Sequence, residues 1–104
     1  MKTPEAKEKD EIDKYLKLIG AYVVKSATFG FGASGHPDRV CCIGGRFVSI
    51  EVKRPGKEPT PIQERRMNEV RATGGVAFWG TSEKVITEMK LWFINDSLKQ
   101  ISPR

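Results

Sequence analysis

Cysteine and histidine are scarce in this sequence, which contains two cysteines and one histidine. The cysteines, Cys41 and Cys42, are adjacent, so they cannot form an ordinary disulfide framework. On a strand their side chains would point to opposite faces, and with His36 they would make a poor zinc site. No asparagine or aspartate stands where it would orient a cysteine–histidine nucleophile. We therefore expect a reducing compartment, one cysteine in the core, and neither zinc nor thiol chemistry.

Long apolar runs are also missing from the chain. No stretch approaches the roughly 20 apolar residues that span a bilayer. The opening residues, Met-Lys-Thr-Pro-Glu, are too polar for a secretory signal. We expect a cytoplasmic protein with no membrane partner, folded as one domain over residues 1–104.

The charge is unbalanced toward the basic side. Eighteen lysines and arginines against 13 acidic residues leave a net charge of +5. Such a balance favours a polyanionic partner, although many small basic proteins bind no nucleic acid.

Turn residues and apolar spacing predict the first helix. Thr3 and Pro4 are typical of an N-cap and a first helical position, and Gly20 is typical of a helix end. The residues between them that recur at helical spacing are Ile12, Tyr15, Leu16 and Ile19. This stripe predicts an amphipathic helix packed on a core.

The rest of the chain alternates between strands and helices. Strands are expected at 21–27, 38–43, 46–53 and 76–79, and later helices from Thr60 to about 73–75 and from Ser82 to about Lys99. The order is α-β-β-β-α-β-α. We therefore predict an α/β fold in which a mixed sheet is flanked by helices.

Two carboxylates are expected to face each other across a hairpin. Gly44-Gly45 separates two β-rich runs, which is a hairpin signal. With these glycines as the loop, paired positions sum to 89, and Asp38 lies opposite Glu51. Opposed side chains of like charge are destabilising. A cation between them would relieve the repulsion, and Mg²⁺ is commonly bound through one or two carboxylates.

Lys53 would extend this site. Residues two apart on a strand share a face, so Lys53 should project beside Glu51, where an ammonium can stabilise a reacting phosphate. In the alternative interpretation, this is a surface hairpin whose carboxylates pair with neighbouring basic side chains. The apolar residues around Glu51 favour the metal site.

At this point the residues resemble a known nuclease family. Gly35-His36-Pro37-Asp38, then Glu51-Val52-Lys53, then Gln63 are similar to the motifs of the PD-(D/E)xK superfamily, and more narrowly of its VRR-NUC domain. The likeness includes the small stand-alone members of bacteria and phages and covers nearly the whole chain. Each motif is short, and their order and spacing together carry the resemblance.

The resemblance implies a restriction-endonuclease-like sheet flanked by helices and the hydrolysis of DNA phosphodiesters. Asp38 and Glu51 would hold Mg²⁺ or Mn²⁺. Stand-alone members are similar to Holliday-junction resolvases in acting on branched DNA as homodimers. The expected setting is a bacterial cell, with a phage origin possible.

Two further site residues come with an alternative role each. The family has a glutamate on its leading helix, for which Glu5, Glu8 and Glu11 compete; Glu5 fits best as a metal ligand, or else it only complements the helix dipole. Gln63 would act in the site, orienting Lys53 or water. It also completes a capping box with Thr60.

DNA contacts are expected around this site. The basic residues near it are Lys53, Arg54, Lys57, Arg65 and Arg66, which would bind phosphates without reading sequence, unless they are only a solvated surface. The stretch Gly30–Gly35 matches a dinucleotide fingerprint, but a proline and a strand follow it in place of a helix. We interpret it as a loop that contacts the DNA backbone through Ser34 and Gly35, or simply links two strands.

Two functions follow from these observations. The first is a metal-dependent endonuclease in which Asp38, Glu51, Lys53, Gln63 and Glu5 form the site. The second is a non-catalytic DNA-binding or interaction module that keeps the nuclease fold. The complete set of carboxylates and lysine favours the first, because a pure binder has no need to oppose two carboxylates.

Overall fold

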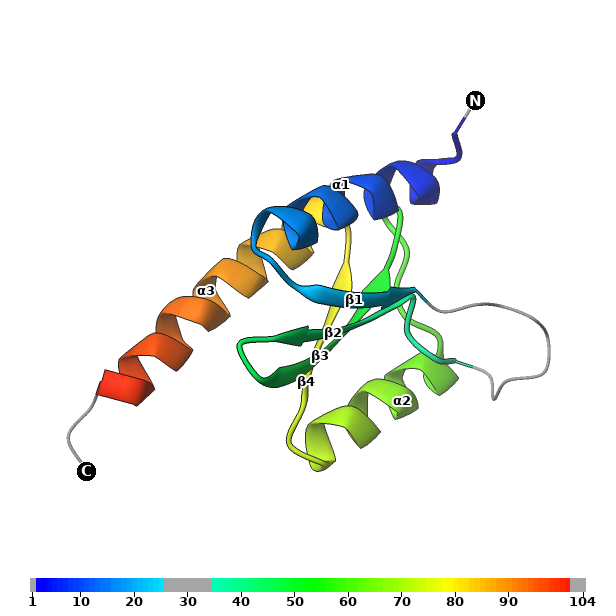
Figure 1. Cartoon of the computed structure of the whole chain (residues 1–104). Coiled ribbons are helices and arrows are strands. Elements are labelled where there is room, and N and C mark those ends of the chain that lie inside the picture. The colour runs from blue at the N-terminus through cyan, green and yellow to red at the C-terminus, as the bar shows by residue number, and fades with distance from the viewer. Residues whose placement is uncertain (1, 26–34, 102–104) are drawn as a thin grey trace.

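The computed structural model describes residues 2–25 and 35–101 of the chain (Figure 1). Its elements are α1 (Pro4–Leu18), β1 (Tyr22–Lys25), β2 (Arg39–Ile43), β3 (Arg46–Val52), α2 (Pro61–Ala72), β4 (Val76–Gly80) and α3 (Ser82–Ile101). The order α-β-β-β-α-β-α confirms the sequence prediction. Residues 26–34, which include Ser34 and most of the glycine-rich stretch, lie outside the described part.

The four strands form one mixed sheet in the order β1-β2-β3-β4. The first three are antiparallel neighbours, and β4 runs parallel to β3, connected to it through α2. Helices α1 and α3 cover one face of the sheet, and α2 lies against the other (Figure 1). The predicted α/β class, with helices flanking a mixed sheet, is therefore confirmed.

The hairpin register agrees with the sequence prediction. Ile43 pairs with Arg46 and Arg39 with Ile50, so paired positions sum to 89. Strand β2 begins one residue later than predicted, because Asp38 lies just before the ladder. Its side chain turns to β3, where Asp38 Oδ2 accepts a hydrogen bond of 2.8 Å from the Val52 amide.

The starts of α1 and α2 follow from their capping residues. Thr3 Oγ1 accepts from the Ala6 amide at 3.1 Å, with Pro4 as the first helical residue. Thr60 and Gln63 form the complete capping box that the sequence predicts. These caps satisfy amides that have no partner inside the helix, and so they determine where each helix begins.

The main core lies between the sheet and the pair α1 and α3. Its fully buried members are Ile12 and Leu16 of α1, Val48, Ile50 and Val52 of β3, and Val85 and Met89 of α3. Cys41 belongs to this core, whereas Cys42 is exposed, which confirms the expectation of one core cysteine. Within residues 2–25 and 35–101, no helix has the length and apolar character needed to cross a membrane.

Candidate active site

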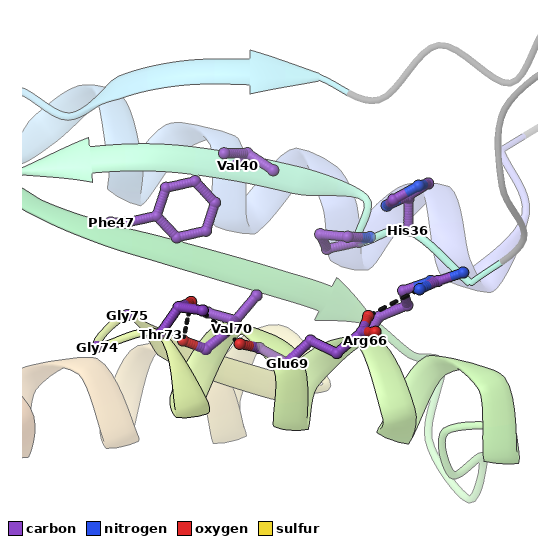
Figure 2. A pocket seen from close by; sticks show the side chains of 10 residues that line it. His36, Val40, Phe47, Arg66, Glu69, Val70, Thr73, Gly74 and Gly75 are labelled. Carbon is purple, nitrogen blue, oxygen red and sulfur yellow. Dashed lines mark hydrogen bonds and ion pairs between the residues drawn. The ribbon is translucent and has the colours of Figure 1, made fainter.

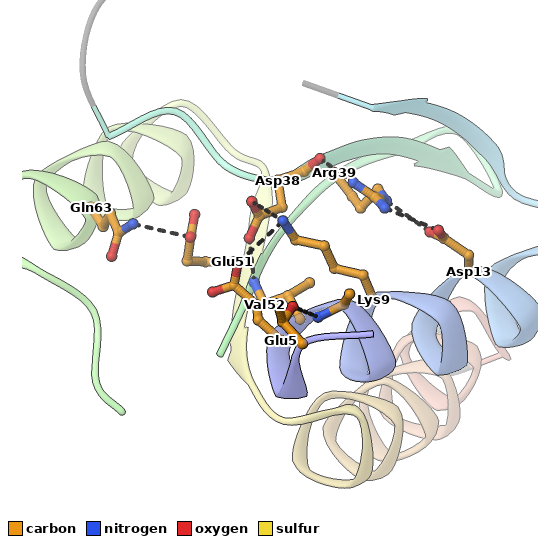
Figure 3. A network of polar contacts seen from close by, with 10 residues as sticks. Glu5, Lys9, Asp13, Asp38, Arg39, Glu51, Val52 and Gln63 are labelled. Carbon is orange, nitrogen blue, oxygen red and sulfur yellow. Dashed lines mark hydrogen bonds and ion pairs between the residues drawn. The ribbon is translucent and has the colours of Figure 1, made fainter. Parts of the chain in front are cut away.

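The two carboxylates of the predicted pair meet where β3 ends. Glu51 is only 4% exposed, and Asp38 faces it from the residue just before β2. The hydrogen bond from the Val52 amide occupies one oxygen of Asp38 and fixes the direction of its side chain (Figure 3). The first turns of α1 and α2 flank the same end of β3.

The electrostatics of Glu51 are unusual for a glutamate. Burial, followed by the negative charge of Asp38, raises the pKa of Glu51 to about 8, and the charge of Lys53 opposes this shift. A buried carboxylate beside a second carboxylate is stable only with a proton or a cation between them. The pair is therefore a place where positive charge is favoured.

Gln63 completes the predicted capping box and also contacts Glu51, whereas its proposed role in orienting Lys53 or water stays a prediction. Its Oε1 accepts from the Thr60 amide at 2.9 Å, which is half of the capping box. Its Nε2 donates to Glu51 Oε1 at 3.0 Å (Figure 3). The cap fixes the amide orientation, so the nitrogen is aimed at Glu51. The start of α2 thus positions the buried carboxylate.

Glu5 and Lys9 reach the site from α1. Lys9 Nζ lies 3.3 Å from Glu5 Oε2 and 3.5 Å from Asp38 Oδ1. Burial opposes the charge of Lys9, but Asp38 and Glu5 outweigh it, so the pKa of Lys9 lies above its ordinary value. Sequence reasoning missed Lys9. The signal was its position four residues after Glu5 on the helix face that carries Ile12.

The other two acidic candidates on α1 have different partners. Glu8 Oε1 accepts from the Ser82 amide at 2.7 Å and from its hydroxyl at 3.0 Å, so Glu8 caps the start of α3. Glu11 forms an exposed ion pair with Lys14. Of the three glutamates, the structure brings Glu5 to the carboxylate pair.

A second ion pair holds the loop of Asp38 against α1. Arg39 Nε and Nη2 donate to the two carboxylate oxygens of Asp13 at 2.7 and 2.9 Å. Arg39 Nη1 also donates to the main-chain carbonyl of Asp38 at 2.9 Å. Arg39 is 8% exposed, and a bidentate pair of this kind is geometrically restrictive. It fixes α1 relative to Asp38.

The residues expected to contact DNA have varied positions. Lys53 directly follows β3, and its amide donates to the Gly80 carbonyl at 2.8 Å. Arg54, Lys57 and Arg65 are exposed, whereas Arg66 is half-buried and pairs with Glu69 at 2.7 Å. Gly35 has a φ of +79°, and a Cβ there would lie 2.9 Å from the Ile62 main chain. Close packing against α2 therefore explains the glycine at position 35.

A groove lies beside the site, between α2 and the strands β2 and β3 (Figure 2). Its volume is about 510 Å³. The lining residues are His36, Pro37, Val40, Phe47, Arg66, Glu69, Val70, Thr73, Gly74 and Gly75. His36 and Arg66 lie at one end of the groove, and Val40, Phe47 and Val70 line it farther along (Figure 2).

The donors at the carboxylate pair suit a hard divalent cation. Asp38 and Glu51 offer only oxygen atoms, and burial together with the charge of Asp38 raises the pKa of Glu51. Across the described residues, no three acidic, histidine or cysteine side chains are arranged as a complete metal cage. Two carboxylates with waters and a substrate phosphate are the usual ligands of Mg²⁺. The residues present fit that pattern.

The sequence of this chain is similar to that of a phage protein. No family model matches the sequence. The chain is 34% identical over 70 residues to the protein named "Putative nuclease p44" of Acyrthosiphon pisum secondary endosymbiont phage 1. The matched stretch covers 62% of this chain and 73% of that relative.

Solved structures give the same placement. One, described as a VRR_NUC domain, superposes with a TM-score of 0.72 at 25% identity and covers 86% of this chain and 97% of its own. Another, a VRR_NUC domain protein, has a TM-score of 0.70 at 19% identity and covers 88% of each chain, which supports the fold alone. The fold, the order of its elements and the phage relative agree, and the chain belongs to the VRR-NUC family of PD-(D/E)xK nucleases.

Proposed function

We propose that this protein is an endonuclease that hydrolyses DNA phosphodiesters with Mg²⁺ or Mn²⁺ and prefers branched DNA. The observation that carries the proposal is the buried Glu51 beside Asp38, whose electrostatics favour a cation. VRR-NUC membership supports nuclease chemistry, and the net charge of +5 suits a polyanionic substrate.

Each side chain of the site has a separate task in this proposal. Asp38 and Glu51 hold the metal ion. When bound, the ion supplies Lewis acidity to the phosphate and lowers the pKa of a water ligand. Gln63 keeps the Glu51 carboxylate oriented through its 3.0 Å hydrogen bond. Glu5 adds negative charge from α1 and holds Lys9.

Lys53 is the proposed catalytic cation. It follows Glu51 by two residues, and its charge acts on the Glu51 carboxylate. An ammonium in this place can bind a non-bridging oxygen of the scissile phosphate and stabilise the charge that develops there. The exposed Arg54 and Lys57 lie in the loop that follows Lys53 and would bind flanking phosphates without selecting a sequence.

Preference for branched DNA and a homodimer complete the proposal. A four-way junction requires two symmetric cuts, and a two-fold dimer presents two identical sites. The similarity to a phage protein favours the cytoplasm of a bacterial host as the place of action. We also propose that residues 1–104 form a single nuclease domain.

The proposal is tested by cleavage of a labelled four-way junction and of linear duplex DNA carrying the same sequences. We expect nicks with Mg²⁺ or Mn²⁺, none with EDTA, and faster cutting of the junction. Equal cutting of both DNAs would remove the junction preference and leave the nuclease. Binding that persists in EDTA, with no nick under any condition, would instead indicate the non-catalytic module.

A further inference from the structure

Among the described residues, Lys9 is the cation that forms an ion pair with the acidic site. Its ammonium lies 3.5 Å from Asp38 Oδ1 and 3.3 Å from Glu5 Oε2. The other oxygen of Asp38, Oδ2, is occupied by the Val52 amide. The oxygen of Asp38 that accepts no hydrogen bond from the Val52 amide, Oδ1, is the one that Lys9 contacts (Figure 3).

The position of Lys9 follows from the packing of α1 on the core. Glu5, Lys9, Ile12 and Leu16 follow one another at helical spacing, and the last two are fully buried. The bidentate pair of Asp13 with Arg39 fixes the same helix against the Asp38 loop. Helix α1 therefore delivers the Lys9 side chain to Asp38 through packing that is independent of the ion pair.

We infer that Lys9 is the resident counter-ion of the acidic site, and that a divalent cation must displace its ammonium from Asp38 in order to bind. The inference rests on the proposed function, because it assumes that Asp38 is a metal ligand. A lysine suits this role since its ammonium is a point charge on a flexible stem that can move away. Lys9 is thus a positioning residue that tunes metal affinity, distinct from the proposed catalytic Lys53.

The test compares Lys9→Met with Lys7→Met by titration of Mn²⁺ without DNA, following free Mn²⁺ by electron paramagnetic resonance. Lys7 lies on the same helix and is exposed, so its replacement changes the net charge equally without touching the site. We expect Lys9→Met to bind Mn²⁺ roughly two- to fivefold more tightly than wild type, as for a competing, partly exposed ion pair. Lys7→Met should match wild type.

A purely structural lysine would give a different result. It would lower the melting temperature of Lys9→Met and leave the Mn²⁺ affinity unchanged, which would overturn the inference while the metal site stands. Weaker binding by Lys9→Met would also overturn it. If Lys9→Met does not fold, Lys9→Gln repeats the titration with a side chain that still forms a hydrogen bond.

The metal site itself is checked with Asp38→Asn, alone and combined with Lys9→Met. Both proteins should lose tight Mn²⁺ binding, which locates the affinity change at Asp38. Absence of Mn²⁺ binding by wild type, Lys7→Met and Lys9→Met alike would overturn the proposed metal site and the inference together. Equal, tight binding by wild type and Lys9→Met overturns the inference alone.

Discussion

Asp38→Asn is expected to abolish metal-dependent DNA cleavage while leaving the fold intact. The asparagine carbonyl can still accept the hydrogen bond from the Val52 amide, which measures 2.8 Å in the structure. The negative charge that would bind the metal ion is lost. Replacing a residue that only supports a metal ligand through a hydrogen bond costs about 10- to 100-fold in metal affinity or activity. Replacing the ligand itself should therefore cost at least about 100-fold.

The matched control is Asp10→Asn, the same chemical change on α1. Asp10 forms an exposed ion pair with Lys2, away from the carboxylate pair. Initial rates of junction cleavage in Mn²⁺ should therefore equal those of wild type for Asp10→Asn. Cleavage by Asp38→Asn within a few-fold of wild type, with both proteins folded by circular dichroism, would remove Asp38 from the site.

Glu51→Gln is expected to make the metal-free protein more stable at alkaline pH, although it should inactivate the nuclease. Burial and Asp38 raise the pKa of Glu51 from its ordinary value of 4.5 to about 8 in the folded state. The folded protein thus binds a proton that the unfolded chain releases. Its stabilising effect is complete below about pH 4.5 and is lost as the pH rises through about 8.

Glutamine resembles the protonated glutamate and still accepts the hydrogen bond from Gln63. At pH 8.5 in EDTA, Glu51→Gln should raise the free energy of unfolding by on the order of 4 kcal/mol over wild type. At pH 5 the two proteins should have nearly equal stability. Urea unfolding at both pH values measures this difference.

Glu11→Gln controls for the loss of one acidic group. Glu11 forms an exposed pair with Lys14, and such pairs contribute about 0–1 kcal/mol. Its stability should change little with pH relative to wild type. A Glu51→Gln protein that is less stable than wild type at pH 8.5 would show that the buried carboxylate is already compensated without metal.

Much of the fold could be predicted because its determinants are local in sequence. Thr3-Pro4 and Thr60-Pro61 mark helix starts through their own geometry. Gly44-Gly45 sets the hairpin register, and that register alone brings Asp38 to Glu51. The parallel pairing of β3 with β4 is different, because a crossover helix separates the strands and no turn transmits the register.

The parts of the site that escaped prediction depend on how α1 docks. Lys9 meets Asp38 across 29 positions, and Glu8 caps Ser82 across 74. Both contacts depend on how α1 is placed against the sheet and α3. Apolar spacing in the sequence predicts that one face of α1 is buried, but it does not predict this placement. The capping role of Gln63 was local and could be predicted from Thr60-x-x-Gln63, whereas its hydrogen bond to Glu51 depends on how α2 lies against β3.

The most direct test of the central claim is anomalous X-ray diffraction from crystals of the protein soaked in Mn²⁺. The account predicts an anomalous peak from a Mn²⁺ ion that is bound by one oxygen of Asp38 and one of Glu51, with the Lys9 ammonium displaced from Asp38. No peak at this pair, with the contact between Lys9 and Asp38 intact at saturating Mn²⁺, would contradict a metal site built on these two carboxylates.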